Sequence, residues 1–145
     1  MTAPVTIVDP DVGGPRLVWA RPAAGGAFDG AWWPHSRNAV TELESIVGVV
    51  GEHMGGDVTR ASLNMNSWDR EQPRRVLVGT SPIRLGWFRT LDPATATFAR
   101  GSGTRVAILV VPPEVDPAMG RELMQRLATA QPWPADAAAT FHSPP

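Results

Sequence analysis

The sequence predicts a single α+β domain, in which a curved, mainly antiparallel sheet of about five to six strands is covered by two helices in the order β-α-β-β-β-β-β-α. Three observations predict it: a helical apolar period before residue 55, a period of two from Val58 onward, and short connections between the later strands. Short connections join antiparallel neighbours. We expect both helices to cover one face of the sheet, which so few strands would also allow to roll partly into a barrel.

The chain has 145 residues, a length that suits one domain with its own hydrophobic core. Proline and glycine punctuate residues 1–15, which we expect to form a flexible N-terminal arm. Residues 16–130 hold the periodic segments and are expected to form the α+β domain. Residues 131–145 are rich in proline and alanine and are expected to form a loose C-terminal tail.

Two segments carry the apolar spacing of amphipathic helices. In the first, Ser36 is the expected N-cap and the pair Gly55-Gly56 the expected end. Its apolar stripe consists of Val40, Leu43, Val47, Val50 and Met54. In the second, Asp116-Pro117 is a typical helix start. Its buried face, up to about Ala130, is expected to carry Met119, Leu123 and Leu127.

The remaining periodic segments are short, as strands are. Residues 17–20 form a β-branched and aromatic run, which predicts the first strand. From Val58, apolar side chains alternate with polar ones, which predicts a half-buried strand. The runs "RRVLV" and "PIRLGWF" flank residues 79–81 and predict a hairpin. "ATATFA" and "RVAILVV" follow, and the second run is apolar on both faces, which places it inside the sheet.

Composition excludes several function classes. The formal net charge of -1 and the pI near 6.3 give no global footprint of a nucleic-acid binder, so such a site would have to be a local patch. All 13 basic side chains are arginine, and without lysine there is no phosphate-binding P-loop. Without cysteine there is no disulfide and no thiolate metal site. Neither a signal peptide nor a membrane-length apolar run is found, so we expect a cytoplasmic protein without membrane contact.

No set of residues has the spacing of a known catalytic or metal centre, so we expect no catalytic residue, cofactor or metal ligand. His35, His53 and His142 have no partners at metal-ligand spacing. Glu42 and Glu44 are expected to face solvent, which leaves no pair of carboxylates in one cleft.

The stretch "FDGAWWPHSRN" before the first helix is the best candidate site. A helix start attracts anions, so Ser36, Arg37 and Asn38 are expected to bind one there, beside His35. Trp32 and Trp33 would form the walls, with one ring packed inward and the other at the surface or in a groove, because neighbours in an extended segment point to opposite sides. Further anchors are expected at Trp68 and Arg89. We therefore expect a non-enzymatic binding or regulatory module for a protein partner or a small anionic ligand.

Two alternatives are kept. In one, the protein is a small hydrolase or transferase that uses His35 with Asp29 or Asp69 as acid and base. In the other, an arginine-bearing sheet face binds single-stranded nucleic acid. Its residues would be Arg60, Asn64, Asn66, Trp68, Arg84 and Phe88. A homodimer through the second helix or a free sheet edge also stays open.

Four motifs, "DGAWWPHSRN", "VTRASLNMNSWD", "PIRLGWFRTLDP" and "ILVVPP", give the chain a family resemblance. Together they resemble a family of small actinobacterial proteins classed as a domain of unknown function. The resemblance covers roughly residues 16–113. It implies an actinobacterial, cytoplasmic source and no particular activity or catalytic residue.

Overall fold

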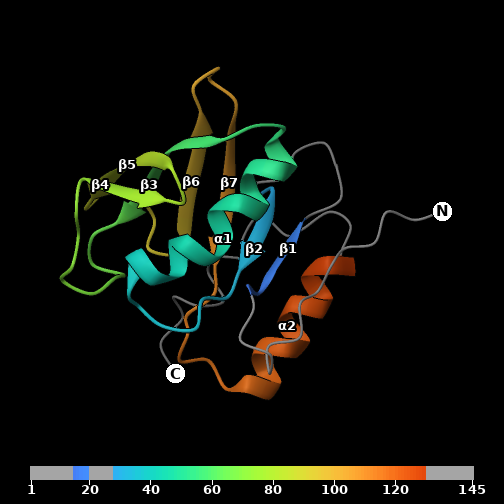
Figure 1. The fold of residues 1–145 in the computed structure, drawn as a ribbon. Coiled ribbons are helices and arrows are strands. Elements are labelled where there is room, and N and C mark those ends of the chain that lie inside the picture. Colours follow the sequence, from blue (N-terminus) through green and yellow to red (C-terminus); the bar gives the residue numbers. More distant parts are fainter. Residues whose placement is uncertain (1–14, 20–27, 130–145) are drawn as a thin grey trace.

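The computed structural model describes residues 15–19 and 28–129, which fold into a seven-stranded sheet with two helices (Figure 1). The predicted tail, and all but the last residue of the predicted arm, lie outside the described residues. The strands are β1 (Leu17–Trp19), β2 (Gly30–Trp32), β3 (Val58–Asn64), β4 (Arg75–Val78), β5 (Ser81–Phe88), β6 (Thr95–Arg100) and β7 (Arg105–Val110). The helices are α1 (Ala39–Met54) and α2 (Pro117–Thr129).

The α+β class and the mainly antiparallel sheet are confirmed. The strand order is β1-β2-β7-β6-β3-β5-β4, with β1 and β4 at the edges, so the sheet does not close into a barrel. Two pairs, β2 with β7 and β3 with β5, are parallel, and the other four are antiparallel. The additional strand is β2, which lies in the stretch directly before the first helix and is not predicted by the sequence.

The two helices cover opposite faces of the sheet, so the expectation that both lie on one face is wrong. Two consecutive residues of β7, whose side chains point to opposite faces, show this. Ile108 packs in the core beneath α1, and Leu109 packs in a second core with Met124 of α2. The α2 side of the sheet is covered next to β1, as Figure 1 also shows. The second half of β7 is therefore buried on both faces, as its apolar run predicts, whereas Arg105 at its start is exposed.

The helix ends differ from prediction in one respect. The N-cap of α1 is Asn38, whose side chain accepts a hydrogen bond from the Thr41 amide, and not Ser36. Gly55 ends the helix in the left-handed conformation (φ 83°), as the glycine pair predicts. Asp116 caps α2 by accepting from the amides of Ala118 and Met119.

The buried face of α2 differs from the prediction at Met119, whereas Leu123 packs against the second core as predicted, and the side chain of Leu127 lies outside the described part of the structure. Met119 is 61% exposed, whereas Gly120 and Met124 are buried against the sheet. Gly120 lies there because an added Cβ would come within 2.3 Å of the Trp33 ring. A helix face that packs on a tryptophan needs a small residue at the point of closest approach, and apolar spacing alone does not reveal that point.

Candidate functional site

Both tryptophans before α1 are buried, so the expectation that one lies at the surface is wrong. Trp32 is 1% exposed in the core beneath α1, where its ring stacks on Trp68 with centroids 5.2 Å apart. Trp33 is 2% exposed in the core beneath α2. The two rings do point to opposite sides of the strand, but helices cover both sides. Trp32 and Trp33 are therefore core residues, and Trp68, which also packs in the core, lines the hollow described below.

Arg16 fixes the Trp33 side of this segment. Its guanidinium carbon lies 3.7 Å from the Trp33 ring centroid, and it donates to the carbonyls of Trp33 and Pro34 at 2.8 Å each. Burial lowers the pKa of Arg16, while the nearby Glu42 carboxylate raises it. The cation over an indole is a packing contact that holds the chain between β2 and α1.

The start of α1 already contains an anion from the protein itself. Glu42, expected at the surface, is 5% exposed. Its carboxylate accepts from the His35 amide at 2.9 Å and from the Ser36 hydroxyl at 2.8 Å. A carboxylate in the first turn complements the helix dipole. The position predicted to attract a ligand is thus occupied by the Glu42 side chain, and the Ser36 hydroxyl donates its hydrogen bond to that carboxylate.

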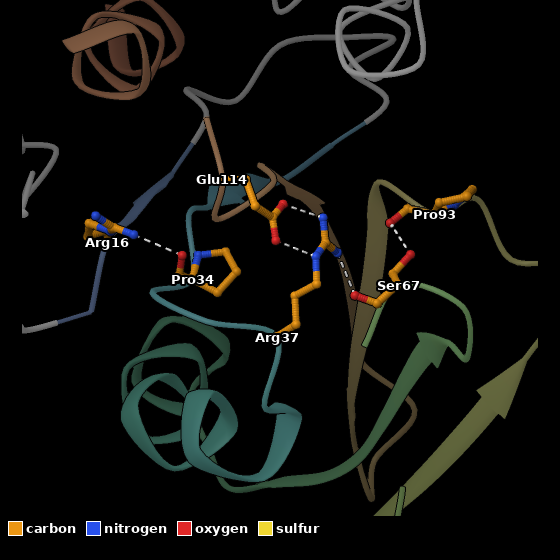
Figure 2. Close-up of polar contacts among 6 residues, drawn as sticks. All are labelled: Arg16, Pro34, Arg37, Ser67, Pro93 and Glu114. Carbon is orange, nitrogen blue, oxygen red and sulfur yellow. Dashed lines mark hydrogen bonds and ion pairs between the residues drawn. The ribbon is translucent and has the colours of Figure 1, made fainter. Parts of the chain in front are cut away.

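Arg37 joins the segment before α1 to the chain between β7 and α2 (Figure 2). Its Nε and Nη2 donate to the two oxygens of Glu114 at 2.6 Å each, and Nη1 donates to the Ser67 carbonyl at 2.6 Å. Such a bidentate pair is among the stronger side-chain contacts. The hydrogen bonds from Arg37 lower the pKa of Glu114 below its usual value. Arg37 therefore acts as a clamp between segments, and binding an anion would require it to release Glu114.

Beside this clamp lies a hollow of about 150 Å³. Its lining is Pro34, Arg37, Ser67, Trp68, Pro93, Ala94, Val110, Pro112 and Pro113. Neither His35 nor Asp69 lines it. Asp29 lies before β2 and accepts the Ala107 amide, whereas His35 lies beyond the other end of β2, so these two residues are separated by the length of the strand. The hollow is therefore not lined by the acid and base residues of the hydrolase alternative.

The side of β6, β3, β5 and β4 opposite to α1, together with the start of β7 at Arg105, is here called the open face. Alternation places Ala61, Leu63, Ile83 and Leu85 under α1 and turns the intervening residues of β3 and β5 to the open face. No helix in the described ranges lies over it. Arg89, which follows β5, is exposed and lines neither the hollow beside Arg37 nor the one described below on the open face.

Four arginines lie in one row across the open face. Strand register pairs Arg60 with Arg84, and Arg84 with Arg75. On the other side Arg60 pairs with Ala99, and Ala99 with Arg105. The arginine row is therefore Arg105, Arg60, Arg84 and Arg75, with Ala99 as the gap between the first two. All four are exposed, and no polar or ionic partner contacts their guanidinium groups among the described residues.

A hollow of about 350 Å³ adjoins the row. It is lined by Arg60, Ser62, Phe88, Thr97, Ala99, Gly103 and Arg105. Ala99 forms a low floor between two guanidinium groups, and Ser62 lies opposite Thr97 in the next row, so two hydroxyls adjoin the floor. The hollow thus combines positive charge, hydrogen-bond donors and an aromatic ring.

The sequence predicts part of the open face. Arg60, Arg84 and Phe88 were predicted to share it and do. Asn64 is buried and donates to the Leu91 carbonyl, and Trp68 lies in the core, so these two do not belong to it. Arg75 and Arg105 were missed. Each stands first in its strand, next to a buried valine, and that signal becomes readable only once the strand register is known.

The described residues show neither a metal site nor a membrane-spanning helix. No group of three or more His, Cys, Asp or Glu side chains there is arranged to hold a metal ion. None of the helices described combines the length and the apolar character that crossing a membrane requires.

A protein-family model matches most of the chain. No curated protein and no solved structure is significantly similar to the chain. The model of a protein family, described as a family of unknown function (DUF5994), matches residues 16–127. This range includes every described strand and nearly all of α2, together with both the clamp and the arginine row. The chain belongs to DUF5994, a family of unknown function.

Proposed function

We propose that the protein is a binding module whose arginine row and adjoining hollow bind a phosphate-bearing anionic ligand. The observation that carries this proposal is the register that aligns Arg105, Arg60, Arg84 and Arg75 across five neighbouring strands without an acidic partner in the described residues. Guanidinium groups bind phosphate oxygens in bidentate fashion.

The charge of the surrounding sheet supports an anion. The strands β3 to β7 contain no aspartate or glutamate and one arginine each. Four of these arginines form the row. The remaining one, Arg100 of β6, lies on the α1 side of the sheet and donates to the Met54 carbonyl. The local positive field is therefore concentrated on the open face, although the whole chain carries a net charge of -1.

This proposal moves the anion site away from the start of α1. There the Glu42 carboxylate and the Arg37–Glu114 pair already satisfy the local charges. On the open face the guanidinium groups keep their hydrogen-bonding capacity for a ligand. Aligned guanidinium groups without partners among the described residues repel one another and do not stabilise the fold, which favours a role in binding an anion.

The test is titration of the protein with medium-chain inorganic polyphosphate by calorimetry at low salt. We expect Arg60→Gln/Arg105→Gln to weaken binding by about tenfold or more, since two charge-assisted contacts are lost. The matched control, Arg70→Gln/Arg74→Gln, removes the same charge from the exposed loop before β4 and is expected to change affinity by about twofold at most. Equal weakening in both double variants, or no binding to the wild type, would contradict the proposal.

The variant Arg37→Gln distinguishes binding at the arginine row from binding at the start of α1. If binding occurs at the arginine row, this variant keeps wild-type affinity for polyphosphate. If Arg37→Gln abolishes binding while Arg60→Gln/Arg105→Gln does not, the ligand binds at the start of α1 instead. The proposal also assumes a cytoplasmic protein, where phosphate-bearing ligands are abundant, and cell fractionation of a source organism tests that location.

A further inference from the structure

One residue of the hollow is not explained by anion binding. Phe88 at the end of β5 is 44% exposed, although large apolar side chains on this sheet are mostly buried. Its ring folds back over Gly86 on the same face. A Cβ added to Gly86 would lie 2.7 Å from the Phe88 Cε2 and 3.0 Å from its Cζ. The glycine thus allows the ring to lie on the sheet surface.

The position of this ring relates it to the arginines. Gly86 lies opposite Ser62 in β3, one row along from the pair of Arg84 and Arg60. The ring therefore lies beside the arginine row, and it lines the same hollow as Arg60 and Arg105. An exposed ring held flat on a sheet, next to hydroxyls and guanidinium groups, suits a ligand that carries flat rings as well as phosphates.

The extent of the row indicates a polymer. From β7 to β4 it crosses four strand intervals, which correspond to about 19 Å at the usual strand spacing. A single phosphate would engage only one part of it, for example the gap at Ala99 between Arg105 and Arg60. A chain of phosphates could run along the whole row.

Resting on the proposed function, we propose that the ligand is a single-stranded nucleic acid, whose backbone follows the arginine row and one of whose bases stacks on Phe88. Unpaired bases are required, because a base inside a duplex has both faces covered by its neighbours. Stacking on an aromatic ring tolerates any base, so binding is expected with little sequence preference.

The test compares four probes by fluorescence anisotropy or competition: a thymidine dodecanucleotide, an abasic chain with the same number of phosphates, a duplex of the same length, and thymidine monophosphate. We expect the dodecanucleotide to bind about tenfold more tightly than the abasic chain. The duplex is expected to bind more weakly than the single strand. The monophosphate is expected to compete only at far higher concentration.

Variants then assign the difference to the ring. Phe88→Ala is expected to weaken binding of the dodecanucleotide by about tenfold and to leave the abasic chain unchanged, whereas Phe88→Tyr keeps wild-type affinity. Leu77→Ala is the matched control, because Leu77 is an exposed apolar residue (65%) that lies on β4 outside the hollow. Thermal unfolding of each variant verifies that the fold is kept.

The outcomes distinguish this inference from the proposed function. If the abasic chain and the dodecanucleotide bind equally, or Phe88→Ala weakens both alike, the base-stacking inference is wrong while anion binding stands. Tighter binding of the duplex, or equal binding of the monophosphate, also overturns the single-strand assignment. If neither the oligonucleotides nor polyphosphate binds, both proposals fail.

Discussion

Arg60 and Arg84 occupy directly opposite positions in the neighbouring parallel strands β3 and β5. Like charges at opposed positions on one face of a sheet destabilise it. Arg75 extends the repulsion, since it pairs with Arg84 on the other side. The fold therefore bears a cost that an anionic ligand would relieve.

Relief of this repulsion is measurable without any ligand. We predict that Arg84→Gln raises the free energy of unfolding by about 0.2–1 kcal/mol at low ionic strength. The gain is expected to shrink in high salt, where exposed charges are screened. Urea unfolding at two salt concentrations measures both effects. Arg70→Gln, which removes a loop arginine, should show no such gain, and a destabilised Arg84→Gln protein would argue against repulsion.

The dependence of the binding constant on salt concentration gives the number of phosphate groups that the protein contacts. For a single-stranded probe, log K is expected to fall with log[salt] by about 0.7 per phosphate contact. Replacing Arg60 by glutamine should flatten the slope by about one contact. Anisotropy titrations of the dodecanucleotide over a salt series measure it, and an unchanged slope in Arg60→Gln would remove that residue from the interface.

The packing of α2 on Trp33 predicts opposite effects for two glycines. Gly120→Ala forces a Cβ to within 2.3 Å of the Trp33 ring, so we expect a loss of about 1–3 kcal/mol in stability. Gly48→Ala in α1 meets nothing within 4 Å and is expected to stabilise by about 0.5–1 kcal/mol. Denaturant midpoints of the two variants check this, and a neutral Gly120→Ala would show that α2 does not pack closely on Trp33.

The buried carboxylate of Glu42 predicts a further stability effect. Glu42→Ala removes the acceptor for the His35 amide and the Ser36 hydroxyl, so we expect a loss of roughly 1–3 kcal/mol. Glu44→Ala, an exposed neighbour in the same helix, is expected to change stability by less than about 0.5 kcal/mol. Equal effects in urea unfolding would place Glu42 at the surface, contrary to the structure.

The Arg37–Glu114 clamp predicts a pH response. Because Arg37 lowers the pKa of Glu114 in the folded protein, the clamp stabilises fully above the ordinary carboxyl pKa of 4.5, and this contribution is lost as pH falls through the lowered value. In Arg37→Gln the Glu114 pKa is expected to return toward 4.5. Carboxyl ¹³C titration by NMR measures the value in both proteins, and identical titration curves would mean that the clamp does not form.

The sequence predicted those elements whose signals are local. The apolar stripe of α1, the left-handed Gly55, the hairpin around residues 79–81 and the Asp116 cap each depend on a few neighbouring residues. β2 was missed because its three residues are too few for a period and because its partner β7 lies far along the chain. Such parallel pairing leaves no nearby turn to reveal it.

The candidate site required information that one sequence does not contain. Trp32 and Trp33 were misplaced because the second helix was assigned to the wrong face, and only coverage of both faces can bury adjacent rings. Arg75 and Arg105 lie 15 and 45 positions along the chain from Arg60, and nothing in the local sequence aligns them with it. Their alignment is a consequence of strand order and register.

We propose that the arginine row is the anion-binding surface, and NMR signals of the arginine side chains report on anion binding at each of them. The Nε–Hε signals of the wild-type protein would be assigned with single Arg→Gln variants and followed during titration with inorganic polyphosphate. We predict that Arg60, Arg75, Arg84 and Arg105 shift with one common affinity, while Arg16 and Arg37, held by internal hydrogen bonds, stay in place. Shifts at Arg37 with none in the arginine row would contradict the claim.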